Sequence, residues 1–273
     1  MNKVKFHYGY PINVDIDTDK QVDVYIDTIE TSPIPERGIR IMILEEPKKD
    51  RAYEFVRSNT HLYTHLLTFH EDLLQTNPKA IKFHMMTGWV RHYVSKHKEF
   101  SVSTVVGGKN DSAMEGYALR HHLWKSRSKI RIPRKFYLSG NAKHFHNFKP
   151  WKEVSYVNEL VLGASKEPLF DSMFHIAIEN TSIKNYFSEK LVDCFQGYSV
   201  PIYYGCTNVE EYFNPAGMFR VNNVNEIIRV CNQLTPEIYY RMKPMMEDNY
   251  NGSLKWLDSQ EQIKNGILQI LEK

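Results

Sequence analysis

The sequence predicts an α/β protein built on parallel sheets and divided into two domains. Its 273 residues suit one large domain or two modest ones, at roughly 150 residues per domain. Short runs rich in β-branched and aromatic residues alternate with helical stretches, which is typical of parallel α/β sheets. Polar loops follow several of these runs, at the position where open α/β sheets bind ligands. Two such sheets suggest a ligand cleft between the domains.

The first domain is expected over residues 1–97. Its strand-like runs are bounded by Pro, Gly, Asn and Asp, and helical stretches fall between the later ones. The expected strands are Val4–Tyr8, Val22–Ile26, Ile39–Leu44, His65–Phe69 and Ala80–Met85, and the expected helices are Ala52–Asn59 and Glu71–Gln75.

The second domain is expected over residues 98–273, after the polar run Ser95–Glu99. A hydroxyl, a proline and a carboxylate at Thr235–Glu237 predict a helix start. Apolar residues recur on one face of a last helix near the C-terminus. The expected strands are Phe100–Val106, Lys135–Ser139, Phe174–Ile178 and Val200–Tyr204. Besides the helix that starts at Thr235–Glu237 and the last helix near the C-terminus, the expected helices are Ala113–Lys125, Glu189–Phe195 and Val224–Gln233.

Composition excludes several classes of protein. Lys and Arg number 35 against 32 Asp and Glu, and the net charge of +3 excludes a polyelectrolyte and gives little support to a nucleic-acid partner. Cys194, Cys206 and Cys231 form no CxxC pair, so neither a disulfide framework nor a thiolate zinc site is expected. This cysteine use indicates a reducing cytoplasm. The sequence contains no run of about 18 apolar residues, so no transmembrane helix is predicted. Any membrane contact is therefore expected to be peripheral.

The alternating acids of VDIDTD do not match a metal motif. A calcium loop beginning at Asp15 would need Gly at its sixth position and Glu at its twelfth, but Lys20 and Ile26 stand there. We interpret Asp15, Asp17 and Asp19 as the solvated face of a strand.

Histidines and a basic run also have ordinary interpretations. His144 and His146, and the pair His121–His122, lack further ligands at a recognisable spacing, and no HExxH is present. Six of the eleven residues Lys125–Lys135 are basic, which predicts a solvated face or a positive field near a phosphate-bearing ligand.

The segment Phe174–Gly205 carries the most informative pattern. Glu179–Thr181 follows an expected strand, and Ser188, Glu189 and Lys190 begin an expected helix. A helix N-terminus and an ammonium group suit phosphate oxygens, and a carboxylate can accept from ribose hydroxyls. The same residues also suit a capped helix with no ligand. The residues alone favour the two interpretations equally.

This segment resembles the donor-binding motif of the family 10 glycosyltransferases, the α-1,3/α-1,4-fucosyltransferases. IENTSIKNYFSEKL and GYSVPIYYG match the family's FENS, Y(V/F)TEKL and G(T/S)VPV elements in order and spacing, with Ile178, Thr181 and Ser188 as replacements. Weaker matches lie upstream: 101–106, 116–124 and 136–140 in the second half, and ILEEP at 43–47, which resembles the family's N-F-E-S-P.

The resemblance implies a GT-B architecture of two Rossmann-like domains facing across a cleft, with GDP-fucose on the C-terminal domain and a glycan acceptor on the N-terminal one. It implies inversion at the anomeric carbon without a metal. Glu45 would be the general base, with Glu46 as the alternative because ILEEP offers two acids. The residues implied to bind the donor are Arg120 and Lys190 at the diphosphate, Glu189 at the ribose, and Asn180 and Tyr186 around the pocket.

Two alternatives to fucosyl transfer stay open at this point. The same fold could use another GDP-sugar, because a nucleotide pocket fixes GDP better than it fixes the sugar. A glycan-binding protein without turnover could also keep the fold. The retained pair Glu189–Lys190 and the acid Glu45 favour an enzyme.

Overall fold

The computed structural model describes residues 4–29, 34, 37–47, 51–109, 111, 113–139 and 160–272. The chain divides into two compact units, the first formed by Met1–Thr87 with Asp258–Lys273 and the second by Gly88–Leu257. The observed division therefore differs from the expected boundary at residue 97, and it assigns the last helix to the first unit. His144 and His146 lie outside the described residues.

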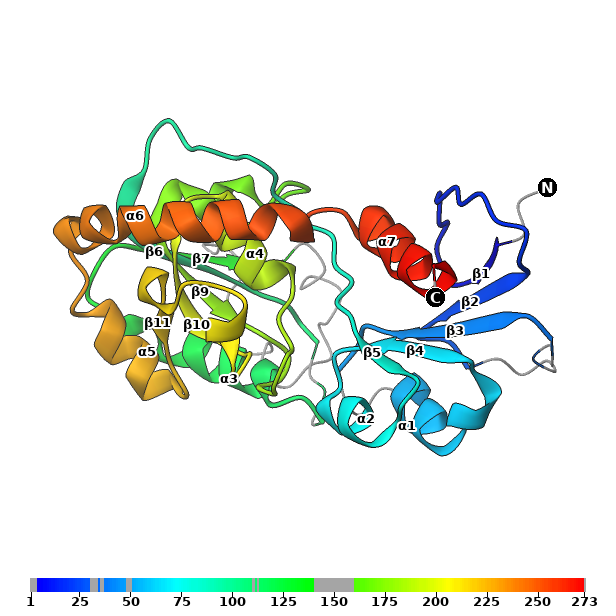
Figure 1. Ribbon diagram of the computed structural model, residues 1–273. Helices are drawn as coiled ribbons and strands as arrows, with labels where there is room; N and C mark the ends of the chain where they lie inside the picture. Colours follow the sequence, from blue (N-terminus) through cyan, green and yellow to red (C-terminus); the bar gives the residue numbers. More distant parts are fainter. Residues whose placement is uncertain are drawn as a thin grey trace. The chain divides into compact units, whose positions relative to one another are not determined.

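The first unit contains a five-stranded parallel sheet with the strand order β1-β2-β3-β4-β5 (Figure 1). Sequential order in a parallel sheet needs a crossover after each strand, and helices supply the later crossovers. The elements are β1 (Val4–His7), β2 (Val22–Ile26), β3 (Ile39–Leu44), α1 (Arg51–Ser58), β4 (His65–Thr68), α2 (Glu71–Thr76), β5 (Ala80–Lys82) and α7 (Ser259–Leu271).

Both faces of this sheet are covered, because side chains alternate along each strand. On one face Val24 and Ile41 pack in a cluster with Ile263 and Ile267 of α7. On the other, Tyr25 and Met42 pack in a cluster with residues of α1 and α2. The C-terminal helix thus completes the core of the first unit, which explains why it belongs there rather than in the second domain.

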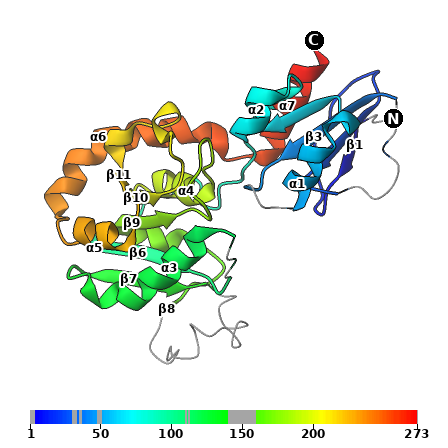
Figure 2. The ribbon, with the colours of Figure 1, turned by 90° about the horizontal axis from the view of Figure 1, so that it is seen from below.

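The second unit contains a six-stranded parallel sheet with the order β11-β10-β9-β6-β7-β8 (Figure 2). Helix α3 packs against α5, and α4 packs against α6 and the central strands. The elements are β6 (Glu99–Val106), α3 (Glu115–Ser126), β7 (Arg134–Leu138), β8 (Leu160–Val161), β9 (Ser172–Ile178), α4 (Glu189–Gln196), β10 (Val200–Tyr204), β11 (Phe219–Arg220), α5 (Val224–Cys231) and α6 (Pro236–Ser253).

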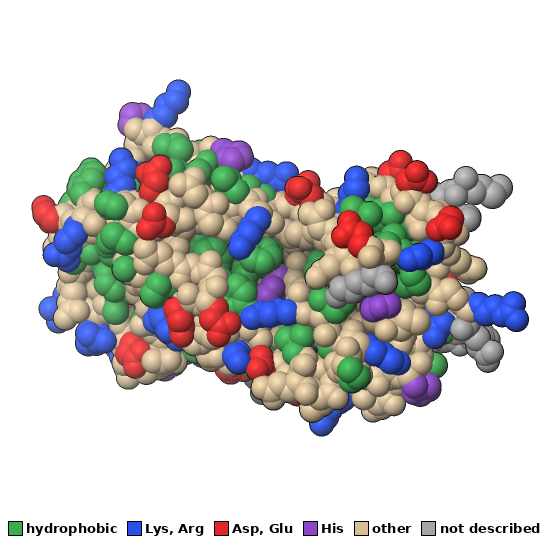
Figure 3. Space-filling model, in the orientation of Figure 1, with side chains coloured by type: hydrophobic (Ala, Val, Ile, Leu, Met, Phe, Trp, Pro, Cys, Tyr) green, Lys and Arg blue, Asp and Glu red, His purple; other side chains and the backbone are tan. Residues whose placement is uncertain are grey.

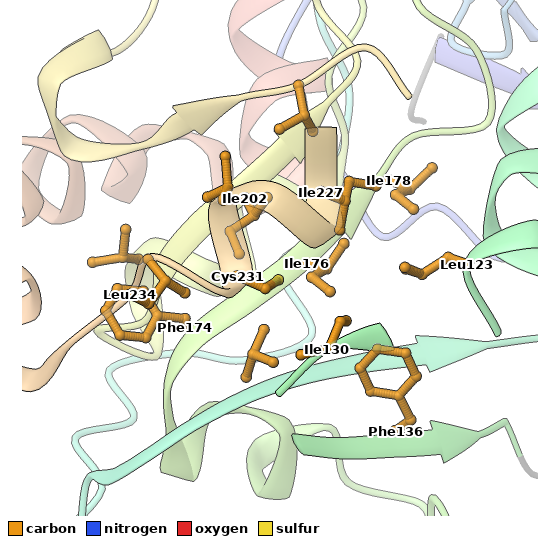
Figure 4. Close-up of a cluster of buried hydrophobic side chains, with 14 of the residues drawn as sticks. Leu123, Ile130, Phe136, Phe174, Ile176, Ile178, Ile202, Ile227, Cys231 and Leu234 are labelled. Carbon is orange, nitrogen blue, oxygen red and sulfur yellow. The ribbon is translucent and has the colours of Figure 1, made fainter. Parts of the chain in front are cut away.

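The core of the second unit forms around β9 and β10 (Figure 4). Ile176 and Ile178 of β9 meet Ile202 of β10 and Ile227 of α5, and all four are at most 3 % exposed. Each such side chain contributes about 1.5–3 kcal/mol to folding. This core holds the carboxyl end of β9 in a fixed position, which matters for the polar residues that follow it.

The structure confirms the predicted parallel α/β class and corrects some details. The expected strand Ala80–Met85 ends at Lys82, and the two-residue strands β8 and β11 gave no pattern in the sequence. Asp15, Asp17 and Asp19 are exposed, but the segment containing them is not a strand. The predicted helix start is confirmed, since the Thr235 hydroxyl accepts a hydrogen bond from the Ile238 amide.

Candidate functional site

A buried carboxylate joins the end of β9 to the start of α4. Glu179 is fully buried, and it accepts hydrogen bonds from the Ser188 amide at 2.9 Å and the Ser188 hydroxyl at 2.6 Å. Burial raises the pKa of Glu179, while the Lys190 ammonium 3.8 Å away opposes that rise. No pattern in the sequence predicted a role for Glu179 by itself. Its position shows that it anchors the loop that ends in Ser188.

An ion-pair network occupies the N-terminus of α4. Lys190 Nζ lies 3.1 Å from both the Ser188 Oγ and Glu189 Oε1, and Lys166 Nζ lies 3.6 Å from Glu189 Oε1. Burial acts to raise the pKa of Glu189, but Lys190 and Lys166 outweigh it and lower the pKa to about 2. Burial likewise acts to lower the pKa of Lys190, and the carboxylates of Glu189 and Glu179 raise it instead. Both groups are therefore ionised, as binding to a polar, charged ligand requires.

Arg120 is brought to the same place by α3. Its Nε donates to the Ile178 carbonyl at 3.0 Å, and its Nη2 donates to Ile178 and, at 2.9 Å, to Asn180 Oδ1. Burial lowers the pKa of Arg120 from its usual range, although the nearby Glu179 opposes this. Across the described residues Nη1 has no hydrogen-bond partner. The guanidinium is thus oriented by the protein and keeps one nitrogen for a ligand.

Arg120, Glu189 and Lys190 line a cavity of about 210 Å³ beside the carboxyl ends of β6 and β9. Arg120, Lys166 and Lys190 supply positive charge, and Glu189 and Asp193 supply negative charge. The remaining lining residues are mostly apolar: Thr104, Val105, Gly107, Ser139, Leu162, Leu169, Phe170, His175, Ile176, Ala177 and Ile178. A mostly apolar cavity with a few convergent charges is typical of a small-molecule site.

Asn180 and Tyr186 are the other two expected donor residues. Asn180 holds the Arg120 guanidinium, and Tyr186 is 5 % exposed. Neither belongs to the lining of the cavity in the described structure. Lys166, His175 and Asp193, in contrast, line the cavity and were not predicted, because they match no motif and come from separate parts of the chain: the loop after β8, the strand β9 and the helix α4.

A second polar cluster lies at the carboxyl edge of the first unit's sheet. The Tyr8 hydroxyl donates to Glu45 Oε1 at 3.1 Å. Asp27 accepts hydrogen bonds from the Glu45 amide at 3.1 Å and the Glu46 amide at 3.0 Å. These residues follow β1, β2 and β3, so the parallel strands bring together positions that are far apart in the sequence. Burial and the charge of Glu45 raise the pKa of Asp27 well above its usual range.

The structure distinguishes the two acids of ILEEP. Glu45 is partly buried and its carboxylate accepts a hydrogen bond from the Tyr8 hydroxyl, whereas Glu46 is exposed. The sequence indicates both acids but not Tyr8 and Asp27, because these two residues belong to no local pattern.

The remaining charged motifs do not contribute to the cavity. No residue of Lys125–Lys135 lines it, and basic and acidic side chains are interspersed on the face of the second unit seen in Figure 3. His121 is buried and bonds to the Gly107 carbonyl at 3.2 Å, while His122 is exposed. Among the described side chains no three His, Cys, Asp or Glu converge on a common point for a metal ion. Within the described ranges no helix is both long and apolar enough to cross a membrane.

No family model and no curated protein matches this sequence. Solved structures do match it, and they identify the fold as that of the GT-B glycosyltransferases, with two parallel-sheet α/β domains. One of them is an α1,3-fucosyltransferase, with a TM-score of 0.58 and 15 % identity, covering 92 % of this chain and 78 % of that one. A structure of an α1,3-fucosyltransferase with GDP-fucose also gives a TM-score of 0.58, at 16 % identity.

Other GT-B structures are about equally similar. TarM has a TM-score of 0.58 at 9 % identity over 90 % of this chain, which spans only 54 % of the length of TarM. Anabaena Alr3699/HepE in complex with UDP-glucose has a TM-score of 0.59 at 10 % identity, covering 86 % of this chain and 72 % of that one. At these identities the likeness defines the fold, and the donor has to be argued from the site.

Proposed function

We propose that this chain is an inverting glycosyltransferase that moves fucose from GDP-fucose to a hydroxyl group of a glycan. The observation that carries the proposal is the network of Lys190, Glu189 and Arg120 around one cavity at the carboxyl edge of β9. The fold supports it, since an α1,3-fucosyltransferase solved with GDP-fucose is among the similar structures. In this proposal Gly88–Leu257 holds the donor, and Met1–Thr87 with Asp258–Lys273 holds the acceptor.

The donor's diphosphate would lie at the N-terminus of α4. Lys190 Nζ and Arg120 Nη1 would bind its oxygens, and the Ser188-capped helix end adds a favourable dipole. Glu189, held ionised by two lysines, would accept from the ribose hydroxyls. Asn180 would act through Arg120 by fixing its guanidinium, and Tyr186 would support the wall of the pocket from within the protein.

Transfer would be a single displacement at the anomeric carbon. Glu45 would take the proton of the acceptor hydroxyl as its oxygen forms a bond to that carbon. The bond from the carbon to the β-phosphate oxygen would break, and its electron pair would leave with GDP. Lys190 and Arg120 would offset the charge that builds up on the departing diphosphate. Tyr8 would orient the Glu45 carboxylate for this step.

Mass-spectrometric detection of released nucleotide tests this function. The intact chain would be incubated with GDP-fucose, GDP-mannose, UDP-glucose and UDP-N-acetylglucosamine, first in water and then with a panel of glycan acceptors. We expect acceptor-dependent release of GDP from GDP-fucose. Turnover of a different GDP-sugar would show the same fold with another donor, and GDP-sugar binding without turnover would indicate a glycan-binding protein.

The same assay in excess EDTA tests the metal-independent mechanism. We expect turnover to persist, because the two cations at the diphosphate can supply the charge stabilisation that a metal ion supplies elsewhere. A complete loss of turnover that added Mg²⁺ or Mn²⁺ restores would contradict this mechanism.

A further inference from the structure

Lys166 brings an ammonium group to the cavity from the loop that follows β8. Its backbone carbonyl accepts a hydrogen bond from the Leu169 amide at 3.0 Å, which fixes the base of the side chain to the short 3₁₀ helix Glu167–Asp171. The side chain then reaches α4, where Nζ lies 3.6 Å from Glu189 Oε1 and 3.7 Å from Asp193 Oδ2. Lys166 thus lines the cavity from a part of the chain separate from α4.

The Lys166 ammonium makes no hydrogen bond to the part of the chain that the structure describes. Its two carboxylate neighbours, Glu189 and Asp193, lie beyond ordinary hydrogen-bonding distance. Its third neighbour is the ring of Trp89, whose centroid lies 4.7 Å from Nζ. The side chain keeps 25 % of its surface exposed. The N–H groups of Lys166 are therefore available to an anionic oxygen in the cavity.

The other lysine of the cavity, Lys190, is more closely compensated by carboxylates. Its Nζ lies 3.1 Å from Glu189 Oε1 and 3.8 Å from the buried Glu179 Oε2. Beside Lys166, in contrast, burial raises the pKa of Asp193 to about 7 although Lys166 opposes this, so a large fraction of Asp193 is uncharged at neutral pH. Of the two lysines, Lys166 is therefore the one with more positive charge left for a ligand.

The two lysines flank one point of the cavity. Lys166 and Lys190 contact the same atom, Glu189 Oε1, from the loop after β8 and from α4 respectively. A diphosphate bound at Lys190 is therefore within reach of Lys166 Nζ, because the lysine side chain is long and flexible. Its anionic oxygens would supply the hydrogen bonds that the Lys166 ammonium lacks, and such charge-assisted bonds are strong.

We propose that Lys166 is a third cation of this site and binds a phosphate oxygen of the nucleotide. The inference rests on the proposed function and deepens it by adding a residue from outside the α4 segment. When Lys166 turns to the phosphate, Glu189 Oε1 loses one of its two ammonium neighbours and can accept from a ribose hydroxyl. Lys166 also helps to offset the charge that builds up on the departing diphosphate.

Calorimetry with GDP on the intact chain tests the inference. Lys166→Met keeps most of the apolar stem but removes the charge, so GDP affinity should fall about 10-fold, the value for one charge-assisted hydrogen bond. Added NaCl should weaken GDP binding less steeply in Lys166→Met than in wild type, because one attractive charge is gone. Lys166→Arg keeps a cation and should recover most of the affinity.

Lys243→Met is the matched control for loss of a lysine charge. Lys243 is exposed on α6 and does not line the cavity, so GDP affinity should stay at the wild-type value. Near-UV circular dichroism and the melting temperature would establish that all the variants fold. Wild-type GDP affinity and salt dependence in Lys166→Met would overturn the inference.

A double variant separates direct binding from an effect through Glu189. In the Glu189→Gln background, Lys166→Met should still weaken GDP binding by a similar factor, because a contact with phosphate does not depend on Glu189. If Lys166→Met has no effect in that background, Lys166 acts only by holding Glu189, and the inference is overturned.

Failure of this inference can be separated from failure of the proposed function. If Lys190→Ala weakens GDP binding and Lys166→Met does not, the assignment of Lys166 alone is wrong. If Lys166→Met weakens GDP binding but the intact chain turns over no GDP-sugar, the transfer activity alone is wrong.

Discussion

The carboxyl edges of the two sheets carry different chemistry. In the second unit Lys190, Arg120 and Glu189 form a network of opposite charges, most of it supplied by a short stretch of chain around α4. In the first unit the corresponding edge carries a phenol and carboxylates, Tyr8, Asp27 and Glu45, each from the end of a different strand.

This difference suits two different tasks. Binding a diphosphate requires cations held in place before the ligand arrives, and the carboxylates Glu179 and Glu189 hold Lys190 in this way. Accepting a proton requires a carboxylate at a fixed position. The Tyr8 hydroxyl donates to the Glu45 carboxylate and Asp27 accepts from the Glu45 amide, so Glu45 is held in place by both its side chain and its backbone. The comparison predicts that mutations at the two edges separate turnover from binding.

The largest effect is expected from Glu45→Gln. Glutamine keeps the shape and can still accept from Tyr8, but it cannot take a proton. Turnover should fall at least ~10²-fold, the contribution of a positioned base, while the affinity for GDP measured by calorimetry stays unchanged.

Glu46→Gln is the matched control for this prediction. Its side chain is exposed and its backbone amide, which bonds to Asp27, is retained, so turnover should stay within a factor of two or so of wild type. If Glu46→Gln loses turnover and Glu45→Gln does not, the base is Glu46. If neither does, the base lies elsewhere.

Lys190→Ala should show the opposite pattern. Loss of one charge-assisted contact to the diphosphate should weaken GDP binding by roughly 1.5–3 kcal/mol, measured by calorimetry. Arg120→Ala should weaken binding similarly and also lower the melting temperature, because Arg120 bonds to Ile178 and Asn180. Wild-type GDP affinity in both variants would contradict the assignment of the phosphate site.

Gly116→Ala probes the packing of α3 against the end of β9, beside Arg120. A Cβ at this position would lie 1.8 Å from the Glu179 carbonyl oxygen, and the Gly116 amide donates to the Asn180 carbonyl at 2.9 Å. The helix would have to move away from β9, at a cost of about 1–3 kcal/mol. Chemical denaturation measures this loss in the free energy of unfolding. Gly252→Ala is the control, since a Cβ there meets nothing within 4 Å. Equal stability of the two variants would contradict the close approach.

The smallest effect concerns pH. Burial raises the pKa of Asp193 to about 7, although Lys166 opposes this, so between about pH 4 and pH 7 the folded state holds a proton that the unfolded state has released. Stability attributable to Asp193 therefore falls as pH rises through this range. Relative to Asp193→Asn, the wild-type free energy of unfolding should drop by up to about 2 kcal/mol from pH 5 to pH 7. Parallel pH profiles of the two proteins would show that Asp193 does not titrate there.

The sequence predicted most of the strands and the helix α4 because their signals are local. Short runs rich in β-branched and aromatic residues predicted β2 and β3 with the observed bounds, and Ser188 caps α4 as expected. The Tyr8–Asp27–Glu45 cluster and His175 could not be predicted, because their partners come from separate strands that only the sheet order brings together. The assignment of α7 failed for the same reason: its apolar face was visible, but not the sheet it covers.

The central claim is that the second unit holds the nucleotide at the carboxyl edge of β9. A crystal structure of the intact chain with GDP tests this claim most directly. We expect diphosphate oxygens within about 3 Å of Lys190 Nζ and Arg120 Nη1. GDP bound elsewhere, or bound here with its phosphates away from Lys190 and Arg120, would contradict it.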